Sequence, residues 1–252
     1  VANGFTRGKS NPCVYFHKDR RLRTLVHGDD YATVGSLEDV RWLQSRLESE
    51  FEMKTVIAGH SRAEGVVPEA KMLNRVVRAA RNGWEYECDQ RHVEIILEEL
   101  QMTNCKPLST PGVEEALKKS DKEEAEGAVP LDPGAATQYR ALVARANYVS
   151  QDRAEIQYAV KELCRTMSAP NVDSWSKLKR LARYLAGRPR AVSKHCWHSL
   201  PEIVDVYSDA NWAGCKASRK STSGGSVLWG SSCLETYSKT QGTIAQSSAE
   251  SE

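Results

Sequence analysis

The sequence lacks any long apolar run, although 40% of its 252 residues are hydrophobic. A helix that crosses a bilayer needs about 20 consecutive apolar residues, and no stretch approaches that length. The first residues also lack the pattern of a secretory signal peptide. These absences predict an intracellular protein that makes no contact with a membrane.

A marked net charge and a paired set of cysteines are absent as well. The 35 Lys and Arg residues nearly balance the 33 Asp and Glu residues, so the formal net charge of +2 indicates no class of partner. Seven cysteines form an odd, scattered set in a chain long enough to bury a sizeable core without disulfides. We therefore expect reduced thiols.

The charge that is present is unevenly distributed. Nine Lys or Arg residues lie between Lys161 and Lys194, against only two acids, Glu162 and Asp173. A helix predicted within this stretch carries four basic residues on its outward face: Lys177, Lys179, Arg180 and Arg183. Two interpretations carry equal weight, namely phosphate contacts with a nucleic acid and an ordinary solvated face.

Local patterns in the first half predict a hairpin and two helices. Short apolar runs flank a turn between Leu25 and Val34. Ser36 and Asp39 resemble a capping box, and the apolar residues of the helix that follows are Val40, Leu43, Leu47 and Phe51. A second helix is predicted in 90–102, with Val93, Ile96, Leu97 and Leu100 on one face.

The second half predicts helices and then strands. Residues 109–137 are rich in Pro, Gly, Ala and acid, which is typical of a linker between two units. Helical segments follow in 138–168 and 172–187, then three strands in 202–240 and a helix that begins at Ser247. We expect an α+β fold.

Two adjacent carboxylates, Asp29 and Asp30, occupy the predicted hairpin turn in the stretch LVHGDDYATVGS. Gly and Asp favour turns for backbone reasons alone, so a solvated turn is one interpretation. The other is a metal site, because adjacent like charges repel unless a cation or solvent compensates them. Mg²⁺ prefers carboxylate oxygens and substrate phosphates as ligands.

Two further carboxylates are candidates later in the sequence. Asp209 ends an apolar strand in VYSDANWAG, where a carboxylate is either placed for use or left at the solvent edge. Ser247 and Glu250 have the spacing of a capping box, so helix initiation explains Glu250. Helix initiation does not explain Glu252, which lies early on the same helix. Glu252 is therefore the second candidate.

The ordered series of motifs resembles the pol polyprotein of copia-type LTR retrotransposons, where reverse transcriptase meets ribonuclease H. In the family's order, the motifs are NPCVYFH, LVHGDDYATVGS, LQSRLESEFEMK, CKPLSTPG, YRALVARANYVSQDRAEIQYAVKELCRTMSAPNVDSWSKLKRLARYL, VYSDANWAGCKASRKSTSGG and AQSSAESE. They cover nearly the whole chain, and their order is more specific than any single motif.

The resemblance implies roles for the four carboxylates. HGDD resembles the family's Tyr-x-Asp-Asp box, with His27 in place of tyrosine, so Asp29 and Asp30 would be metal ligands of the polymerase. SDANWAG and SSAESE resemble two segments of ribonuclease H, so Asp209 and Glu252 would be its catalytic, metal-binding acids. The implied cofactor is Mg²⁺, because both chemistries use two metal ions to steady the attacking and leaving oxygens.

The resemblance also implies a domain order. A partial polymerase palm and thumb would occupy 1–108, a linker 109–137, a helical thumb or connection segment 138–195, and the first strands of a ribonuclease H-like α/β domain 196–252. The implied partners are an RNA template, a DNA primer, an RNA–DNA hybrid and the rest of the pol polyprotein. The implied location is a cytoplasmic particle or the nucleus.

The chain starts at Val1 rather than Met and stops where a helix begins, so we expect a piece of a longer protein. The other acids of both sites are expected beyond these ends. We therefore expect the chain alone to be inactive, although the parent would copy RNA into DNA and hydrolyse RNA in hybrids. The alternative is a non-enzymatic remnant of a retroelement whose basic helices bind nucleic acid.

Overall fold

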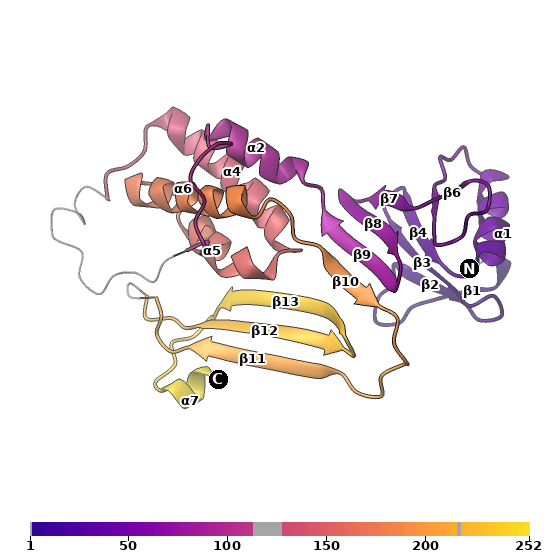
Figure 1. The fold of residues 1–252 in the computed structure, drawn as a ribbon. Helices are drawn as coiled ribbons and strands as arrows, with labels where there is room; N and C mark the ends of the chain where they lie inside the picture. Colours follow the sequence, from indigo (N-terminus) through magenta and orange to yellow (C-terminus); the bar gives the residue numbers. More distant parts are fainter. Residues whose placement is uncertain (1, 113–127, 216–217) are drawn as a thin grey trace. The chain divides into compact units, whose positions relative to one another are not determined.

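The computed structural model describes residues 2–112, 128–215 and 218–252, which form two compact units (Figure 1). The first unit comprises Val1–Ala79 and the second Ala80–Glu252. The sequence predicted a boundary within 109–137, but residues 80–108 belong to the second unit. Of that predicted linker, residues 113–127 lie outside the described part of the chain.

The first unit contains an antiparallel sheet with the strand order β1-β2-β3-β4, one helix and two short strand pairs. After a 3₁₀ turn, η1 (Ala2–Gly4), the sheet consists of β1 (Phe5–Arg7), β2 (Val14–His17), β3 (Leu22–His27) and β4 (Asp30–Val34). The remaining elements are α1 (Leu37–Glu48), β5 (Ile57–Ala58) paired in parallel with β6 (Val66–Val67), and the hairpin of β7 (Glu69–Met72) and β8 (Arg75–Ala80).

Helix α1 begins where the sequence predicts. Ser36 is the N-cap, and its Oγ accepts the Asp39 N–H at 3.2 Å and donates to the Asp39 carboxylate at 2.6 Å. Hydrogen bonds from Ser36 and from Arg20 hold the pKa of Asp39 below its usual value. The helix ends at Glu48, so the prediction that Phe51 lies on its apolar face is wrong, and Phe51 is exposed.

A ring cluster packs α1 against the sheet. His17 is buried, and its ring meets Phe5 edge-on at a centroid distance of 5.2 Å and Trp42 of α1 at 5.5 Å. The Arg20 guanidinium lies 4.2 Å from the Trp42 ring centroid and forms an ion pair with Asp39 at 2.7 Å. The sheet that carries the predicted hairpin therefore has a fixed support.

The second unit combines a group of helices with two antiparallel strand arrangements. Its helices are α2 (Arg91–Glu99), α4 (Pro133–Ser150), α5 (Ala154–Arg165), α6 (Val172–Gly187) and α7 (Ser248–Ser251). Its strands are β9 (Gly83–Cys88), which pairs with β10 (Ser193–Cys196), and the three-stranded sheet of β11 (Asp205–Asn211), β12 (Thr222–Trp229) and β13 (Ser232–Thr240).

Helices α2, α4, α5 and α6 share one hydrophobic core. The predicted apolar face of α2 is buried in it, and the fully buried side chains from the other helices include Val143, Val149, Ile156, Val160, Leu178, Leu181 and Leu185. Because α2 buries its apolar face against helices that follow residues 109–137, the unit boundary lies before α2. Among the described helices, none is long and apolar enough to cross a membrane.

The predicted helical segment 138–168 is two helices rather than one. Helix α4 begins early, at Pro133, because the Asp132 side chain caps it by accepting two backbone N–H bonds at 3.0 Å, within the stretch predicted as a linker. The break before α5 contains Arg153, which is 1% exposed. Its Nε donates to the Glu155 carboxylate at 2.8 Å and its Nη2 to the Arg188 carbonyl at 2.9 Å. These bonds compensate the buried charge.

Candidate functional site

Asp29 and Asp30 lie at the tip of the β3–β4 hairpin, as the sequence predicts. His27 pairs with Asp30, which leaves a two-residue loop of Gly28 and Asp29. Gly28 adopts a φ of +59°, whereas the φ of Asp29 is not positive, as in a type II′ turn, which favours Gly at its first central position. The turn therefore fixes where both carboxylates leave the backbone.

Both carboxylates of the tip are exposed, and neither forms a hydrogen bond or ion pair with another described residue. Their oxygens suit Mg²⁺, which is commonly held by one or two carboxylates together with waters and substrate phosphates. However, the described residues contain no group of three or more His, Cys, Asp or Glu side chains that could hold a metal ion. The tip is thus a partial ligand set.

Asp209 lies on β11 and lines an open cleft of about 560 Å³ within the second unit. One wall of this cleft comes from α5, with Gln157 and Tyr158, and the rest from β11, β12 and β13. Asp209 is exposed, and its cross-strand neighbour on β12 is Gly224. The carboxylate therefore stands beside a position that has no side chain.

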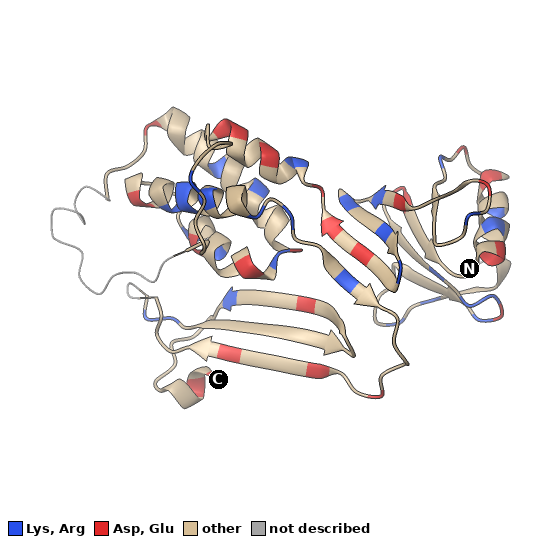
Figure 2. Cartoon of the chain, viewed as in Figure 1, with Lys and Arg blue, Asp and Glu red and all other residues tan. Residues whose placement is uncertain are grey.

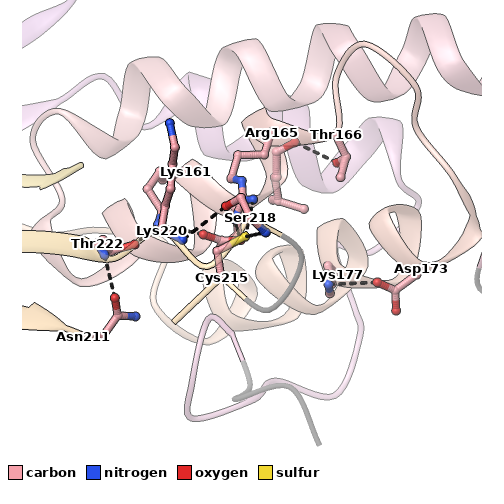
Figure 3. A network of polar contacts seen from close by, with 12 residues as sticks. Lys161, Arg165, Thr166, Asp173, Lys177, Asn211, Cys215, Ser218, Lys220 and Thr222 are labelled. Atoms are coloured by element: carbon pink, nitrogen blue, oxygen red, sulfur yellow. Dashed lines mark hydrogen bonds and ion pairs between the residues drawn. The ribbon is translucent and has the colours of Figure 1, made fainter. Parts of the chain in front are cut away.

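Three polar side chains spaced four residues apart on α5 contact the sheet or the segment between its first two strands. We call them the α5 ladder: Gln157, Lys161 and Arg165. Gln157 Nε2 donates to Thr236 Oγ1 of β13 at 2.9 Å, and Lys161 Nζ donates to Thr222 Oγ1 of β12 at 2.6 Å. Residues four apart share one face of a helix, so the three contacts lie along one face of α5. Figure 3 shows those of Lys161 and Arg165.

Arg165, the third residue of the α5 ladder, contacts a cysteine in the segment between β11 and β12. Arg165 Nη2 donates to Cys215 Sγ at 2.7 Å, and the Ser218 backbone N–H donates to the same sulfur at 3.4 Å (Figure 3). Partial desolvation raises the pKa of Cys215, but the hydrogen bonds from Ser218 and Arg165 outweigh it and lower the pKa to about 7. All seven cysteines are free.

Glu252 follows α7, a single-turn helix that starts as the sequence predicts. Ser247 Oγ accepts the Glu250 N–H at 3.2 Å, and the Gln246 N–H donates to the Glu250 carboxylate at 2.6 Å, so capping explains Glu250. Glu252 is exposed and does not line the cleft that contains Asp209. The structure therefore does not bring these two candidate acids together in one cleft.

The predicted basic face of α6 is largely engaged with the protein itself. Lys177 Nζ pairs with Asp173 at 2.8 Å, Arg180 Nη2 donates to Thr110 Oγ1 at 2.8 Å, and Arg183 Nε donates to the Lys106 carbonyl at 2.8 Å. Lys179 is exposed and has no partner within the described ranges. Both signs of charge occur along the helices of the second unit (Figure 2).

Sequence reasoning missed the α5 wall of the cleft. The four-residue spacing of Gln157, Lys161 and Arg165 was a readable signal, because the apolar residues Ile156, Val160 and Leu163 lie on the buried stripe beside it. What that spacing could not reveal was the partners, since Cys215 and the sheet residues Thr222 and Thr236 lie 50 to 79 positions later in the chain.

Comparison with known proteins identifies relatives among transposon products. The chain is 31% identical over 168 residues to an uncharacterized mitochondrial protein of Arabidopsis thaliana, which covers 64% of each chain. It is 33% identical over 165 residues to the retrovirus-related Pol polyprotein from transposon RE2 of the same plant, covering 65% of this chain. It is 27% identical over 249 residues, or 96% of its length, to the Pol polyprotein from transposon TNT 1-94 of Nicotiana tabacum.

The chain spans only part of these relatives, namely 64% of the mitochondrial protein, 11% of the RE2 polyprotein and 18% of the TNT 1-94 polyprotein. No family model matches the chain, and no solved structure matches it. The alignment to the tobacco polyprotein nevertheless extends over nearly the whole of this chain. These relatives support the interpretation of the chain as a fragment of a retrotransposon Pol polyprotein.

Proposed function

We propose that this part of the polyprotein carries portions of two catalytic modules. Residues 1–108 and 138–195 would belong to the palm and thumb of an RNA-directed DNA polymerase, and 196–252 would begin a ribonuclease H-like domain. The observation that carries the proposal is the β3–β4 tip, which presents the adjacent residues Asp29 and Asp30 without a partner among the described residues. Its partners would be an RNA template, a DNA primer and an RNA–DNA hybrid, in a cytoplasmic particle or the nucleus.

The residues of the chain have distinct tasks in this proposal. Asp29 and Asp30 would hold Mg²⁺ at the polymerase site, with the hairpin fixing both carboxylates. Asp209 at the cleft and Glu252 after α7 would each supply one ligand of the hydrolytic site, although Glu252 does not line the cleft. When bound, Mg²⁺ supplies charge neutralisation for the attacking and leaving oxygens of phosphoryl transfer.

We expect this chain alone to catalyse neither reaction. Each site presents at most two of the carboxylates that a two-metal site needs, and small misplacement of catalytic groups costs large factors in rate. The assay incubates the purified chain and Mg²⁺ with a primed RNA template or with a labelled RNA–DNA hybrid. Extension that disappears in Asp29→Asn, or cleavage that disappears in Asp209→Asn, would overturn the expectation of inactivity.

The complementary experiment tests the assignment of the two modules. The chain is expressed together with the coding sequence that flanks it in the polyprotein, and both activities are measured. Asp29→Asn should abolish primer extension and leave hybrid cleavage intact, whereas Asp209→Asn should have the opposite effect. If both variants retain both activities, the proposed roles of these carboxylates are wrong.

The alternative is a non-enzymatic remnant that binds nucleic acid through the basic helix α6. Three of its four candidate cations are hydrogen-bonded or paired within the chain, and only Lys179 is exposed and unpartnered among the described residues. A sequence-independent contact would weaken as salt increases, because phosphate contacts release counterions. Binding that is unaffected by salt, or unchanged when Lys177, Lys179 and Arg180 become Ala, would reject it.

A further inference from the structure

The cleft between α5 and the three-stranded sheet is aromatic and rich in hydroxyl groups. Tyr158 of α5 is 48% exposed and Tyr207 of β11 is 61% exposed, and both line the cleft. Tyr207, Asp209 and the pair of Ser226 and Thr236 share one face of the sheet, which is the face that Gln157 of α5 contacts. An exposed carboxylate, two exposed aromatic side chains and several hydroxyl groups thus line the same cleft.

The floor of the cleft beside Asp209 is open because its neighbour on β12 is Gly224. A Cβ at Gly224 would meet nothing nearer than the Tyr237 carbonyl oxygen, at 3.7 Å, which is an ordinary contact. At the adjacent Gly225, a Cβ would lie 2.7 Å from the Tyr237 ring. A side chain added at Gly224 would therefore enter open space, whereas one added at Gly225 would collide with the Tyr237 ring.

This combination of groups suits a nucleoside. Aromatic side chains stack on bases without regard to sequence, and a carboxylate can accept a hydrogen bond from a ribose hydroxyl. A cleft of about 560 Å³ lies in the size range of small-ligand sites. Only an unpaired base can present its face to a tyrosine, because a paired base is already stacked within its helix.

We propose that this cleft binds one unpaired nucleotide of a single-stranded RNA, with its base against Tyr158 and Tyr207 and its ribose beside Asp209. The binding requires neither a metal ion nor a second strand, so it goes beyond the hydrolysis of a hybrid. Lys161 supports the α5 wall, because its Nζ lies 4.5 Å from the Tyr158 ring centroid while donating to Thr222.

The test measures binding of the whole chain to a fluorescein-labelled oligouridylate by fluorescence anisotropy, at low salt and with EDTA. Gly224→Val fills the cleft with a side chain that suits a strand. Gly242→Val is the matched control, since a Cβ there meets nothing within 4 Å and the residue lies outside the cleft. We expect Gly224→Val to weaken binding about tenfold or more and Gly242→Val to leave it unchanged, with the circular dichroism of both variants unaltered.

Two further variants separate stacking from general attraction. Tyr158→Ala should weaken binding by about tenfold, whereas Tyr158→Phe should retain it because the ring is kept. Oligodeoxyuridylate should bind more weakly than oligouridylate, since it has the same base and lacks only the 2′-hydroxyl that the proposal places beside Asp209.

The proposal is overturned if the wild-type chain does not bind oligouridylate, or if Gly224→Val binds as tightly as wild type. It is also overturned if Lys179→Ala removes binding while Gly224→Val does not, because the basic face of α6 would then be the site. Failure of the hydrolysis assays leaves this metal-free measurement untouched, so the two proposals fail separately.

Discussion

The β3–β4 tip of the first unit and the cleft of the second unit both present carboxylates, but they are built in different ways. At the tip, Asp29 and Asp30 are adjacent in the sequence, and a two-residue turn places both of them. At the cleft, Asp209 on β11 faces a wall from α5, which lies about 50 residues earlier in the chain. The tip therefore depends on local backbone geometry, whereas the cleft depends on the docking of distant elements onto a helical core.

The largest expected effect is on stability, when a buried side chain is removed from the hydrophobic core of the second unit, on which the cleft depends. Leu181→Ala in α6 removes a fully buried side chain, so the free energy of unfolding of the second unit should fall by about 2–5 kcal/mol. Denaturant unfolding followed by far-UV circular dichroism measures it. Leu200→Ala is the control, since Leu200 is 78% exposed and should change the value by less than about 0.5 kcal/mol.

The corresponding test at the β3–β4 tip replaces Gly28, whose backbone conformation the turn requires. Gly28 has a φ of +59°, and a Cβ there meets nothing within 4 Å, so any cost of substitution comes from the backbone. Gly28→Val should lower the stability of the hairpin by about 1–2 kcal/mol, whereas Gly28→Asn should cost less because Asn visits this conformation more readily. Hydrogen exchange of the Leu25 amide, which faces Ala32 of β4, measures both. Equal protection in the two variants would contradict the turn assignment.

The docking of the sheet on α5 can be tested through Lys161, the middle residue of the α5 ladder. Lys161→Met keeps the length of the side chain but loses the hydrogen bond to Thr222, which should loosen the sheet by about 1 kcal/mol. Faster hydrogen exchange in β12 would report it. Lys179→Met removes an exposed lysine that has no described partner and should leave β12 unchanged.

The smallest expected effect is a pH dependence of the unfolding free energy, which comes from Cys215, the residue that Arg165 contacts. The pKa of Cys215 is lowered in the folded chain to about 7 from an ordinary value of 9, so thiolate stabilisation is complete above about pH 9 and is lost as the pH falls through 7. The unfolding free energy should therefore rise between pH 7 and 9, by less than about 1 kcal/mol because solvent screens a partly exposed pair. In Cys215→Ser, which lacks the thiol, the unfolding free energy measured with urea should lack this rise between pH 7 and 9.

Local signals predicted the elements that present the carboxylates. The Gly-Asp-Asp turn predicted the hairpin, Ser36 predicted the start of α1, and the spacing of Ser247 and Glu250 predicted the start of α7. Each of these depends on hydrogen bonds between residues only a few positions apart.

Features set by distant contacts were not predictable in the same way. The boundary near residue 80 follows from the burial of α2 against later helices, which no local pattern records. The break between α4 and α5 contains buried Arg153, whose carbonyl partner on Arg188 lies 35 residues away. The cleft required the pairing of α5 with a sheet formed much later in the chain.

The pairing of β9 with β10 has a consequence for how the second unit folds. The register places Gly83 opposite Cys196, so β9 is synthesised about a hundred residues before its partner strand. Forming this pair first would close a very long loop at a large entropic cost. We therefore expect the helices between the two strands to associate first and to draw the strand ends together. Arg190 and the Glu87 carboxylate, which join at 2.7 Å and 3.1 Å, would then close the unit late in folding.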